Sequence, residues 1–413
     1  MNMKKRKLAI IGGGPAGFMA AVNAAENSDN LQINIYEKSS PLKTILYTGN
    51  GRCNLANNIT DFKELASNYP RGEKFLYSVF SRFGVDETLQ WLNSRGLETY
   101  VQEDNRIFPK SDKATSVRSL FLNRASIFKI NIVKSEVIEA INTEDGFKIR
   151  TNKGFFEYDA LIISTGGNCT DSNNGYNFAR SLGHKVTALK PALTSLLAAE
   201  KWVKAFAGVS IKDARVQSFF NKKKISELTG DFVFTHKGIA GPAIFDTSSY
   251  CAFFDYSRKT PLLLKINFLS EVNCDELEAD LLSEISASAT KSVLNILKKY
   301  IPKSLIAVLL TNQGIDPDKK VASITAKERK AILKFLLETE INIISPDKNG
   351  EIVTAGGIEL KEVNPKTMES KLHKNLYFCG EILDIDGLTG GFNLQMCWST
   401  GCIAGLNSAK TLF

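Results

Sequence analysis

Three glycines near the start of the chain have the spacing of a dinucleotide-binding turn. They form Gly12-x-Gly14-x-x-Gly17, directly after an apolar run at residues 8–11, and an alanine-rich segment follows. The run predicts a buried strand and the later segment predicts a helix, with Pro15 in its first turn. Gly12 permits a tight turn, Gly14 lets the backbone approach a pyrophosphate, and Gly17 lets the helix lie close to the sheet. The helix N-terminus would offer N–H groups to the phosphates.

A carboxylate stands where such a nucleotide site needs one. Glu37 lies twenty residues after Gly17 and ends a second alternating run, residues 33–36. A carboxylate at this position accepts hydrogen bonds from the ribose of the bound nucleotide. Strand, glycines, helix, strand and acid together therefore predict a βαβ nucleotide site. The alternative is a glycine-rich turn that binds nothing.

The next segment carries polar groups and a thiol in an irregular loop. Glycines and asparagines interrupt residues 43–54 and exclude a regular helix or strand. Gly51 gives the loop freedom, Arg52 and Asn54 supply donors, and Cys53 supplies a thiol. In a dinucleotide-binding domain this loop lies where the cofactor runs toward its reactive ring. The alternative is a loop that merely turns the chain.

Further glycines and polar residues follow a buried strand near the end of the chain, at residues 375–379. A carboxylate at the end of such a strand can hold ribityl hydroxyls. The backbone amides of a helix that begins near Asn393 can face the negative O2 side of a reduced flavin. This segment favours FAD over NAD as the cofactor. Its candidate cofactor-binding residues are Gly380, Glu381, Asp384, Gly391, Asn393 and Gln395.

Between these two parts, short alternating runs predict a second sheet. They occupy residues 130–133, 136–141, 147–150 and 155–158, and a buried strand at 159–167 follows. An antiparallel meander followed by a returning parallel strand is typical of an α/β, two-dinucleotide-binding (glutathione-reductase-like) fold. The candidate contacts here are the backbone of Val137 for the adenine, Thr165 and Gly166 for the adenosine diphosphate, and the adjoining Gly167.

The middle of the chain differs in character from both ends. Strand patterns dominate residues 191–270, and charge-laced helical patterns dominate 271–345, which include a capping box at Thr325-x-x-Glu328. We therefore predict a discontinuous FAD domain (1–190 and 346–413) interrupted by a barrel-like half and a helical half. His236 and Lys237 lie in a loop of the strand-rich half. This loop either holds substrate over the flavin or is a plain hairpin connection.

Composition narrows the class of protein. The formal net charge is +8, which suits nucleic acid or an anionic substrate but also an ordinary lysine-rich surface. No run of about eighteen apolar residues predicts a membrane span. The seven cysteines are scattered without a CxxC pair, which favours free thiols in the cytoplasm and no metal site. The oligomeric state is not predicted by these features.

Several segments together resemble the YhiN/BaiN/RdsA-like family of bacterial FAD-dependent oxidoreductases. They are residues 11–17, 49–54, 108–110, 165–167, 191–193, 235–242, 354–357 and 387–395, so the resemblance covers nearly the whole chain. It implies an FAD domain with a barrel-like and helical insert. The FAD contacts that it implies are Gly12, Gly14, Ala16, Glu37, Lys38, Asn54, Val137, Thr165, Glu381, Asn393 and Leu394.

The resemblance also implies a redox activity. Family members have been connected with oxidation or reduction of amines and steroids, and with reduction of a uridine in large-subunit ribosomal RNA to dihydrouridine. Our leading hypothesis is a reductase in which NAD(P)H reduces FAD and the substrate is ribosomal RNA. Cys53, His236 and Lys237 are the candidate proton donors, and Cys53 is otherwise a small packing residue. The alternatives are a small-molecule oxidase or dehydrogenase, and an FAD-stabilised protein that binds RNA or the ribosome without catalysis.

Overall fold

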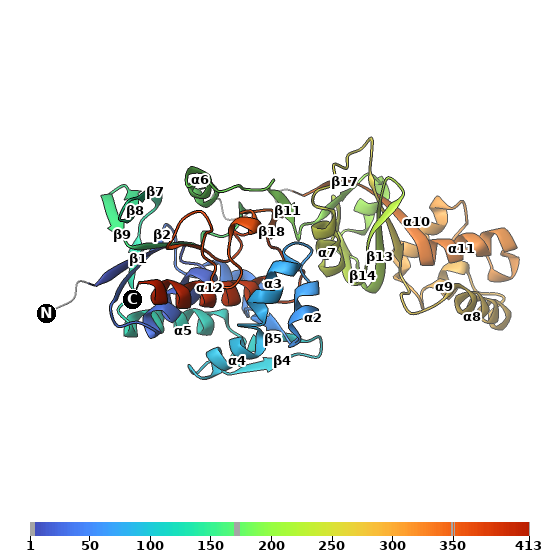
Figure 1. Ribbon diagram of the computed structural model, residues 1–413. Coiled ribbons are helices and arrows are strands. Elements are labelled where there is room, and N and C mark those ends of the chain that lie inside the picture. Colours follow the sequence, from blue (N-terminus) through green and yellow to red (C-terminus); the bar gives the residue numbers. More distant parts are fainter. Residues whose placement is uncertain (1–4, 169–173, 348–349, 351, 413) are drawn as a thin grey trace. The chain divides into compact units, whose positions relative to one another are not determined.

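The computed structural model describes residues 5–168, 174–347, 350 and 352–412, so Cys169 lies outside the described residues. The chain forms two compact units (Figure 1). The first contains residues 1–190 and 353–413, and the second contains residues 191–352. The nucleotide-type segments at both ends of the sequence therefore belong to one unit.

A parallel sheet forms the centre of the first unit. Its described strands run in the order β19-β10-β1-β2-β6, and each neighbouring pair is parallel. Because β1 is paired on both sides, its residues Leu8, Ala9 and Ile10 are all fully buried. The strands are β1 (Arg6–Ile11), β2 (Leu31–Glu37), β6 (Asn131–Lys134), β10 (Ala160–Ile163) and β19 (Leu376–Phe378).

Two long helices of this unit lie in direct contact (Figure 1). They are α1 (Pro15–Glu26) and α12 (Phe392–Thr411). A Cβ at Gly401 would lie 2.5 Å from the Ala16 carbonyl oxygen, and one at Gly405 would lie 2.2 Å from that of Ala20. The two helices therefore run parallel, with glycines that let their backbones approach closely.

Smaller elements surround this core. The described helices are α2 (Phe62–Ser67), α3 (Glu73–Phe80), α4 (Val85–Asn93), α5 (Ala114–Ile127) and α6 (Asn174–Ser181), with short 3-10 turns η1 (Thr44–Gly51) and η6 (Leu360–Glu362). The short strands are β3 (Ala56–Asn57), β4 (Thr99–Val101), β5 (Arg106–Pro109) and β18 (Val353–Ala355).

The predicted meander has one strand fewer than expected. Strands β7 (Val137–Thr143), β8 (Gly146–Thr151) and β9 (Gly154–Tyr158) form an antiparallel sheet before the chain returns through β10. The run at 130–133 pairs in parallel with β2 instead, as β6. A four-residue alternating run does not specify which sheet it joins, so its assignment to the meander was wrong.

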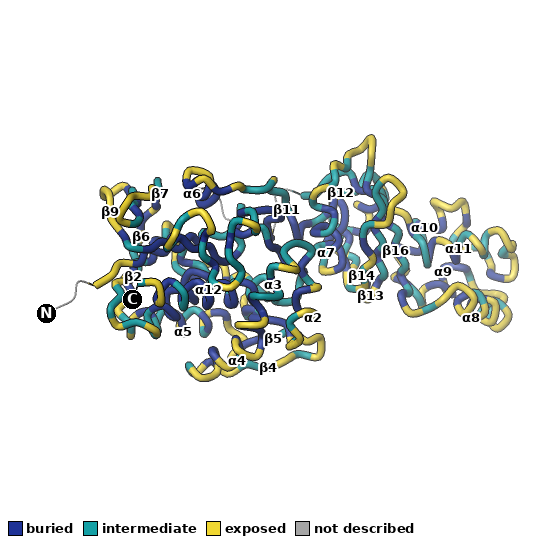
Figure 2. Tube along the Cα trace, in the orientation of Figure 1, coloured by how far each residue is buried: buried dark blue, intermediate teal, exposed yellow. Residues whose placement is uncertain are grey.

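The second unit is built on a closed barrel. Its strand order is β12-β15-β14-β13-β16-β17, and every described pair is antiparallel. Alternate residues fill its interior, as in β16, where buried residues alternate with partly buried ones, and Figure 2 shows the barrel strands largely in dark blue and teal. The strands are β12 (Leu196–Ala198), β13 (Ser210–Phe220), β14 (Lys223–Phe234), β15 (Gly238–Ala240), β16 (Leu262–Asn267) and β17 (Thr339–Pro346).

Helices occupy the sequence between the last two barrel strands. Thr325 caps α11 (Ala326–Glu338) and Glu328 completes the box, which confirms that prediction. The chain then re-enters the barrel through β17, although we expected helix-dominated sequence up to residue 345. The remaining elements are β11 (Lys190–Ala192), η3 (Lys201–Phe206), α7 (Pro242–Cys251), α8 (Cys274–Ala287), α9 (Val293–Leu297), α10 (Lys303–Asn312) and η4 (Val321–Ser323). No helix in the described parts of the chain is long and apolar enough to cross a membrane.

Candidate functional site

The glycine turn between β1 and α1 has two tightly packed positions and one open one. Gly12 has φ +106°, and a Cβ there would lie 2.4 Å from the Ser164 carbonyl oxygen. A Cβ at Gly17 would lie 2.1 Å from the Gly12 carbonyl oxygen. A Cβ at Gly14 would meet no atom of the described chain within 4 Å. Only Gly14 thus leaves room for a ligand at the start of α1.

Glu37 is held beside this turn by backbone and hydroxyl donors. Gly13 N–H donates to its Oε2 at 2.8 Å, and the N–H and hydroxyl of Ser39 both donate to its Oε1 at 2.7 Å. The carboxylate is therefore fixed at the end of β2 and retains acceptor capacity for a ribose hydroxyl. Lys38, the next residue, is exposed.

The end of β10 forms the neighbouring wall. Gly166 has φ +80°, and a Cβ at Gly167 would lie 2.4 Å from Glu381 Oε1, so this turn lies directly against the end of β19. The Thr165 hydroxyl is buried and has no hydrogen-bond partner among the residues that the structure describes. A buried hydroxyl usually has a partner, so this one suits a ligand atom.

The carboxyl end of β19 contacts both α1 and β18. A Cβ at Gly380 would lie 2.8 Å from Ala16 Cβ, which brings the strand end against the first turn of α1. Glu381 accepts a hydrogen bond from Thr354 N–H at 2.9 Å. This interaction orients the carboxylate that we expect to hold ribityl hydroxyls.

Asp384 is a second carboxyl group in the same region. One of its oxygens, Oδ1, is buried without a partner in the described part of the chain. Burial raises the pKa of Asp384 above its ordinary range, although a hydrogen bond from Thr187 and the charge of Arg71 oppose this.

The loop that precedes β3 has an unusual backbone. Gly49, Asn50, Gly51 and Cys53 all have positive φ, and Cys53 N–H donates to the Thr48 carbonyl at 3.0 Å. The Cys53 side chain is fully buried, and burial raises the pKa of its thiol to about 12. The thiol is therefore protonated at neutral pH but is a weak acid, which favours the packing role over proton donation.

This loop reaches the beginning of α12. Asn54 Oδ1 would be 2.8 Å from a Cβ at Gly391, and it is buried with no partner among the described residues. Arg52 instead stacks on a ring: its guanidinium carbon lies 4.1 Å from the centroid of Phe108. The structure thus brings Asn54 and Gly391 together, while Arg52 braces the loop from β5.

Among the described residues, no side chain at the capping position closes the N-terminus of α12. Gly391 occupies the capping position, and the Asn393 side chain binds the preceding loop, accepting from Gly387 N–H at 2.9 Å. Leu394 is partly exposed beside it. The fully buried Gln395 amide donates to the Gly84 carbonyl at 3.0 Å and to other groups of the interior, so its nitrogen serves the fold.

The two uncapped helix N-termini point the same way. Where the two helices touch, Gly401 of α12 lies opposite Ala16 of α1. The first residue of α12, Phe392, lies nine residues before Gly401. Since α1 starts one residue before Ala16, the offset is eight residues, and at 1.5 Å per residue α12 begins about 12 Å beyond the start of α1 along the shared direction. Both ends attract negative charge. One extended ligand with negative charge near both helix ends would suit this arrangement.

Three further predicted residues lie on β7 and in the second unit. Val137 is buried at the start of β7, opposite Thr151. His236 and Lys237 are exposed and lie between β14 and β15 in the second unit. Their contacts with a cofactor or substrate stay predictions.

Sequence reasoning missed residues that support the site. Gly13 and Thr354 donate backbone N–H groups to the two key carboxylates, and Thr354 Oγ1 accepts from Asn168 N–H at 2.7 Å. Asn57 Nδ2 donates to the Gly390 carbonyl at 3.3 Å. The segment 354–357 stood out in the sequence, but nothing there assigned its role.

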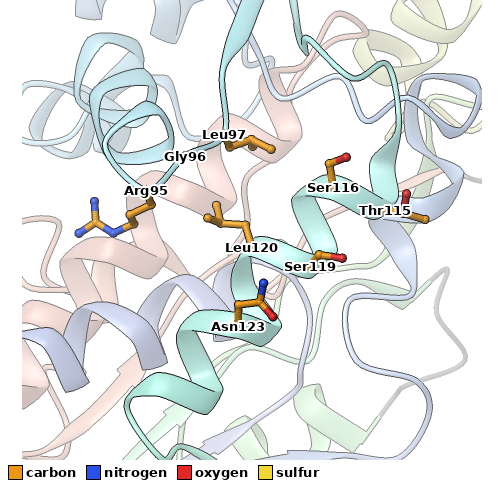
Figure 3. Close-up of a pocket in the computed structure, with 8 residues that line it drawn as sticks. All are labelled: Arg95, Gly96, Leu97, Thr115, Ser116, Ser119, Leu120 and Asn123. Atoms are coloured by element: carbon orange, nitrogen blue, oxygen red, sulfur yellow. The ribbon is translucent and has the colours of Figure 1, made fainter.

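Other features of the described residues do not belong to this site. An open pocket of about 380 Å³ lies between the α4–β4 connection and α5 (Figure 3). No predicted cofactor residue lines it; its lining residues are Arg95, Gly96, Leu97, Thr115, Ser116, Ser119, Leu120 and Asn123. Within the described ranges, no cluster of His, Cys, Asp or Glu could hold a metal ion.

The chain's own residues fit FAD on these observations. The open position at Gly14 and the uncapped start of α1 suit a pyrophosphate, and Glu37 suits a ribose. The buried oxygens of Thr165 and Asn54, which have no partner among the described residues, lie at the end of β10 and beside Gly391 and are available to accept hydrogen bonds from such a ligand.

Comparisons with known proteins agree with this assignment. The family model described as the HI0933-like protein Rossmann domain matches residues 6–407. A 3-dehydro-bile acid delta(4,6)-reductase from Clostridium scindens is 33% identical over 98% of this chain and 99% of its own. A ribosomal RNA dihydrouridine synthase from Escherichia coli is 26% identical over 99% of this chain and 100% of its own.

Solved structures support the fold alone. A flavocytochrome c3 fumarate reductase in its open conformation has a TM-score of 0.51 and 14% identity, covering 100% of this chain and 79% of its own. The FrdA subunit of Escherichia coli quinol fumarate reductase also has a TM-score of 0.51, with 15% identity, covering 99% and 71%. The chain therefore belongs to the HI0933-like Rossmann family and is an FAD-dependent oxidoreductase.

Proposed function

We propose that this enzyme reduces an electron-poor carbon–carbon double bond that is conjugated to a carbonyl group. The observation that supports this most is the chemistry shared by its relatives' names. A 3-dehydro-Δ4,6 bile acid and a uridine both contain such a bond, and each named activity saturates one. The substrate size differs greatly, but the reacting group is the same.

The cofactor and the chain have separate tasks in this proposal. Bound FAD, reduced by NAD(P)H, supplies a hydride to the double bond. Gly14 and the start of α1 hold the pyrophosphate, Glu37 holds a ribose, and Glu381 holds the ribityl chain. The start of α12 stabilises negative charge on the ring system. The family resemblance implies further FAD contacts at Lys38, Val137 and Leu394, and these stay predictions.

The chain must also supply a proton to the neighbouring carbon. Cys53, His236 and Lys237 remain our candidates from the sequence. The buried thiol of Cys53 is protonated, but its pKa of about 12 makes it a slow acid at pH 7. His236 and Lys237 are exposed, which leaves them accessible to a large substrate.

Uridine in large-subunit ribosomal RNA is the favoured substrate, with hydride added to C6 and a proton to C5, in the cytoplasm. The net charge of +8 supports an anionic partner, and Lys and Arg outnumber Asp and Glu between residues 191 and 270. A further relative, from Haemophilus influenzae, is also named a ribosomal RNA dihydrouridine synthase and is 27% identical. The 33% identity to the bile acid reductase favours a steroid-like small molecule as the second candidate.

One experiment separates these substrates. The FAD-loaded protein is reduced anaerobically with NADPH or NADH and then offered either unmodified large-subunit RNA or a 3-dehydro-Δ4,6 bile acid. New dihydrouridine, measured by nucleoside mass spectrometry, would establish the RNA reductase. Saturation of the bile acid with unchanged RNA would establish the small-molecule enzyme. If neither substrate is reduced and neither NADPH nor NADH reduces the flavin, the proposal is wrong. That result would instead support an FAD-stabilised protein that binds RNA or the ribosome without catalysis.

A further inference from the structure

Residues 68–72, to which the sequence analysis assigned no role, contact the loop at residues 385–388 that leads into α12. We propose that the ion pair between Arg71 and Asp386 is a positioning device that sets the reduction potential of the flavin by fixing the N-terminus of α12. This inference rests on the proposed flavin site at that N-terminus, but it does not depend on which substrate is reduced.

The ion pair is bidentate and largely out of solvent. Arg71 donates from Nε and Nη2 to the two carboxylate oxygens of Asp386. The Asp386 side chain is fully buried and that of Arg71 is 17% exposed. The two residues also form an antiparallel backbone bridge. A forked, buried pair fixes geometry more firmly than an exposed one.

Neighbours of Arg71 hold the rest of the same loop. Tyr69 is 1% exposed and donates its hydroxyl to the Phe392 carbonyl at 2.6 Å, in the first turn of α12. Leu388 N–H donates to the Asn68 carbonyl at 3.0 Å. A Cβ at Gly72 would lie 2.6 Å from Ile385 Cγ1, so the two segments touch there as well.

The loop is also tied to the helix from the other side. Gly387 N–H donates to Asn393 Oδ1 at 2.9 Å, and Asn393 Nδ2 donates back to the Gly387 carbonyl at 2.8 Å. Asp386 is the adjoining residue. The path from the ion pair to the first turn of α12 therefore consists of one peptide bond, from Asp386 to Gly387, and the two hydrogen bonds between Gly387 and Asn393.

Position, not net charge, is the means by which this pair acts. Arg71 and Asp386 neutralise each other, so their combined field at a flavin is small. The field that favours a reduced, negatively charged flavin comes from the N–H groups at the start of α12. These stabilise negative charge only while they are aimed at it, so loosening the loop weakens binding of reduced flavin more than of oxidised flavin.

Arg71→Lys tests this, because it keeps the charge and removes the fork. We expect the affinity for reduced flavin to fall about tenfold more than that for oxidised flavin, which lowers the two-electron potential by about 30 mV. The potential is measured by equilibration with a reference dye, and the oxidised-flavin Kd by fluorescence. Tyr69→Phe removes one hydroxyl at the same loop and serves if Arg71→Lys does not fold. Its shift should have the same sign.

The chain offers a matched control in Arg95→Lys. Arg95 is 20% exposed, donates from two nitrogens to Glu26, and lies in the same unit, but Glu26 is at the opposite end of α1 from the glycine turn. Its substitution should leave the potential unchanged.

Two results would overturn the inference. An unchanged potential in Arg71→Lys and Tyr69→Phe, even with weaker FAD binding, would show that the pair serves the fold alone. A potential that stays fixed in Arg71→Lys but rises in Asp386→Asn would show that charge, not position, acts at the flavin. Failure of the RNA and bile acid assays would leave these measurements intact, because they require only bound flavin.

Discussion

Replacing Gly14 by alanine separates cofactor binding from folding in the glycine turn. Gly14 has φ −86°, which alanine adopts readily, and an added Cβ meets no described atom within 4 Å. The protein without FAD should therefore be as stable as the wild type, or more stable by about 0.4–1 kcal/mol, because alanine restricts the unfolded chain.

The effect on FAD binding should be large. The new methyl group would enter the space through which the backbone approaches the pyrophosphate, and such overpacking costs about 1–3 kcal/mol. Since 1.4 kcal/mol is a factor of ten, the FAD dissociation constant should rise roughly 5- to 150-fold. Urea denaturation of the FAD-free protein and fluorescence titration with FAD measure the two quantities.

Gly17→Ala provides the contrast. Its Cβ would lie 2.1 Å from the Gly12 carbonyl oxygen, so this substitution should destabilise the FAD-free protein itself. If Gly14→Ala bound FAD with wild-type affinity, the assignment of the pyrophosphate to this turn would be refuted.

Three further results are expected. Cys53 should resist alkylation at pH 8 in the native protein while the exposed Cys274 reacts, because burial keeps its pKa near 12; peptide mass spectrometry compares the two, and equal labelling would contradict the buried thiol. Burial lowers the pKa of His184 despite the opposing Glu362, so its contribution to stability is complete above about pH 6.5 and is lost as pH falls below it. Urea denaturation between pH 5 and 8 should therefore show a steeper loss in wild type than in His184→Asn. Gly405→Ala should lower the free energy of unfolding by about 1–3 kcal/mol, because its Cβ would lie 2.2 Å from the Ala20 carbonyl oxygen; an unchanged urea midpoint would contradict the close contact between α1 and α12.

Local patterns in the sequence predicted most of the fold. The βαβ unit at the start, the returning strand β10 and the final strand and helix all form one parallel sheet with its helices, as expected. These elements were predictable because glycine spacing, caps and apolar runs act within a few residues. The sheet that residues 130–133 join was not predictable, because this edge strand is fixed by its tertiary pairing with β2.

The residues that orient the binding carboxylates were harder to predict than the carboxylates themselves. Glu37 and Glu381 are evident from their places at strand ends, but the N–H groups of Gly13 and Thr354 that orient them are present in every residue and leave no mark in the sequence. The ion pair of Arg71 could not be predicted either, because its partner Asp386 lies 315 residues away in the sequence. Such pairs become visible only when the chain is folded.

The parallel contact between α1 and α12 joins these observations into one argument about the cofactor. A single nucleotide site needs one helix N-terminus, and α1 alone would serve NAD as well as FAD. Because Gly401 and Gly405 place α12 parallel to α1, its N-terminus extends in the same direction and can meet the distal ring of the same ligand. A flavin ring, which becomes negative on reduction, is attracted to that second N-terminus, whereas a nicotinamide ring is positive when oxidised and neutral when reduced, so neither of its states is attracted there. The position of α12 therefore favours flavin chemistry for a physical reason that is independent of family resemblance.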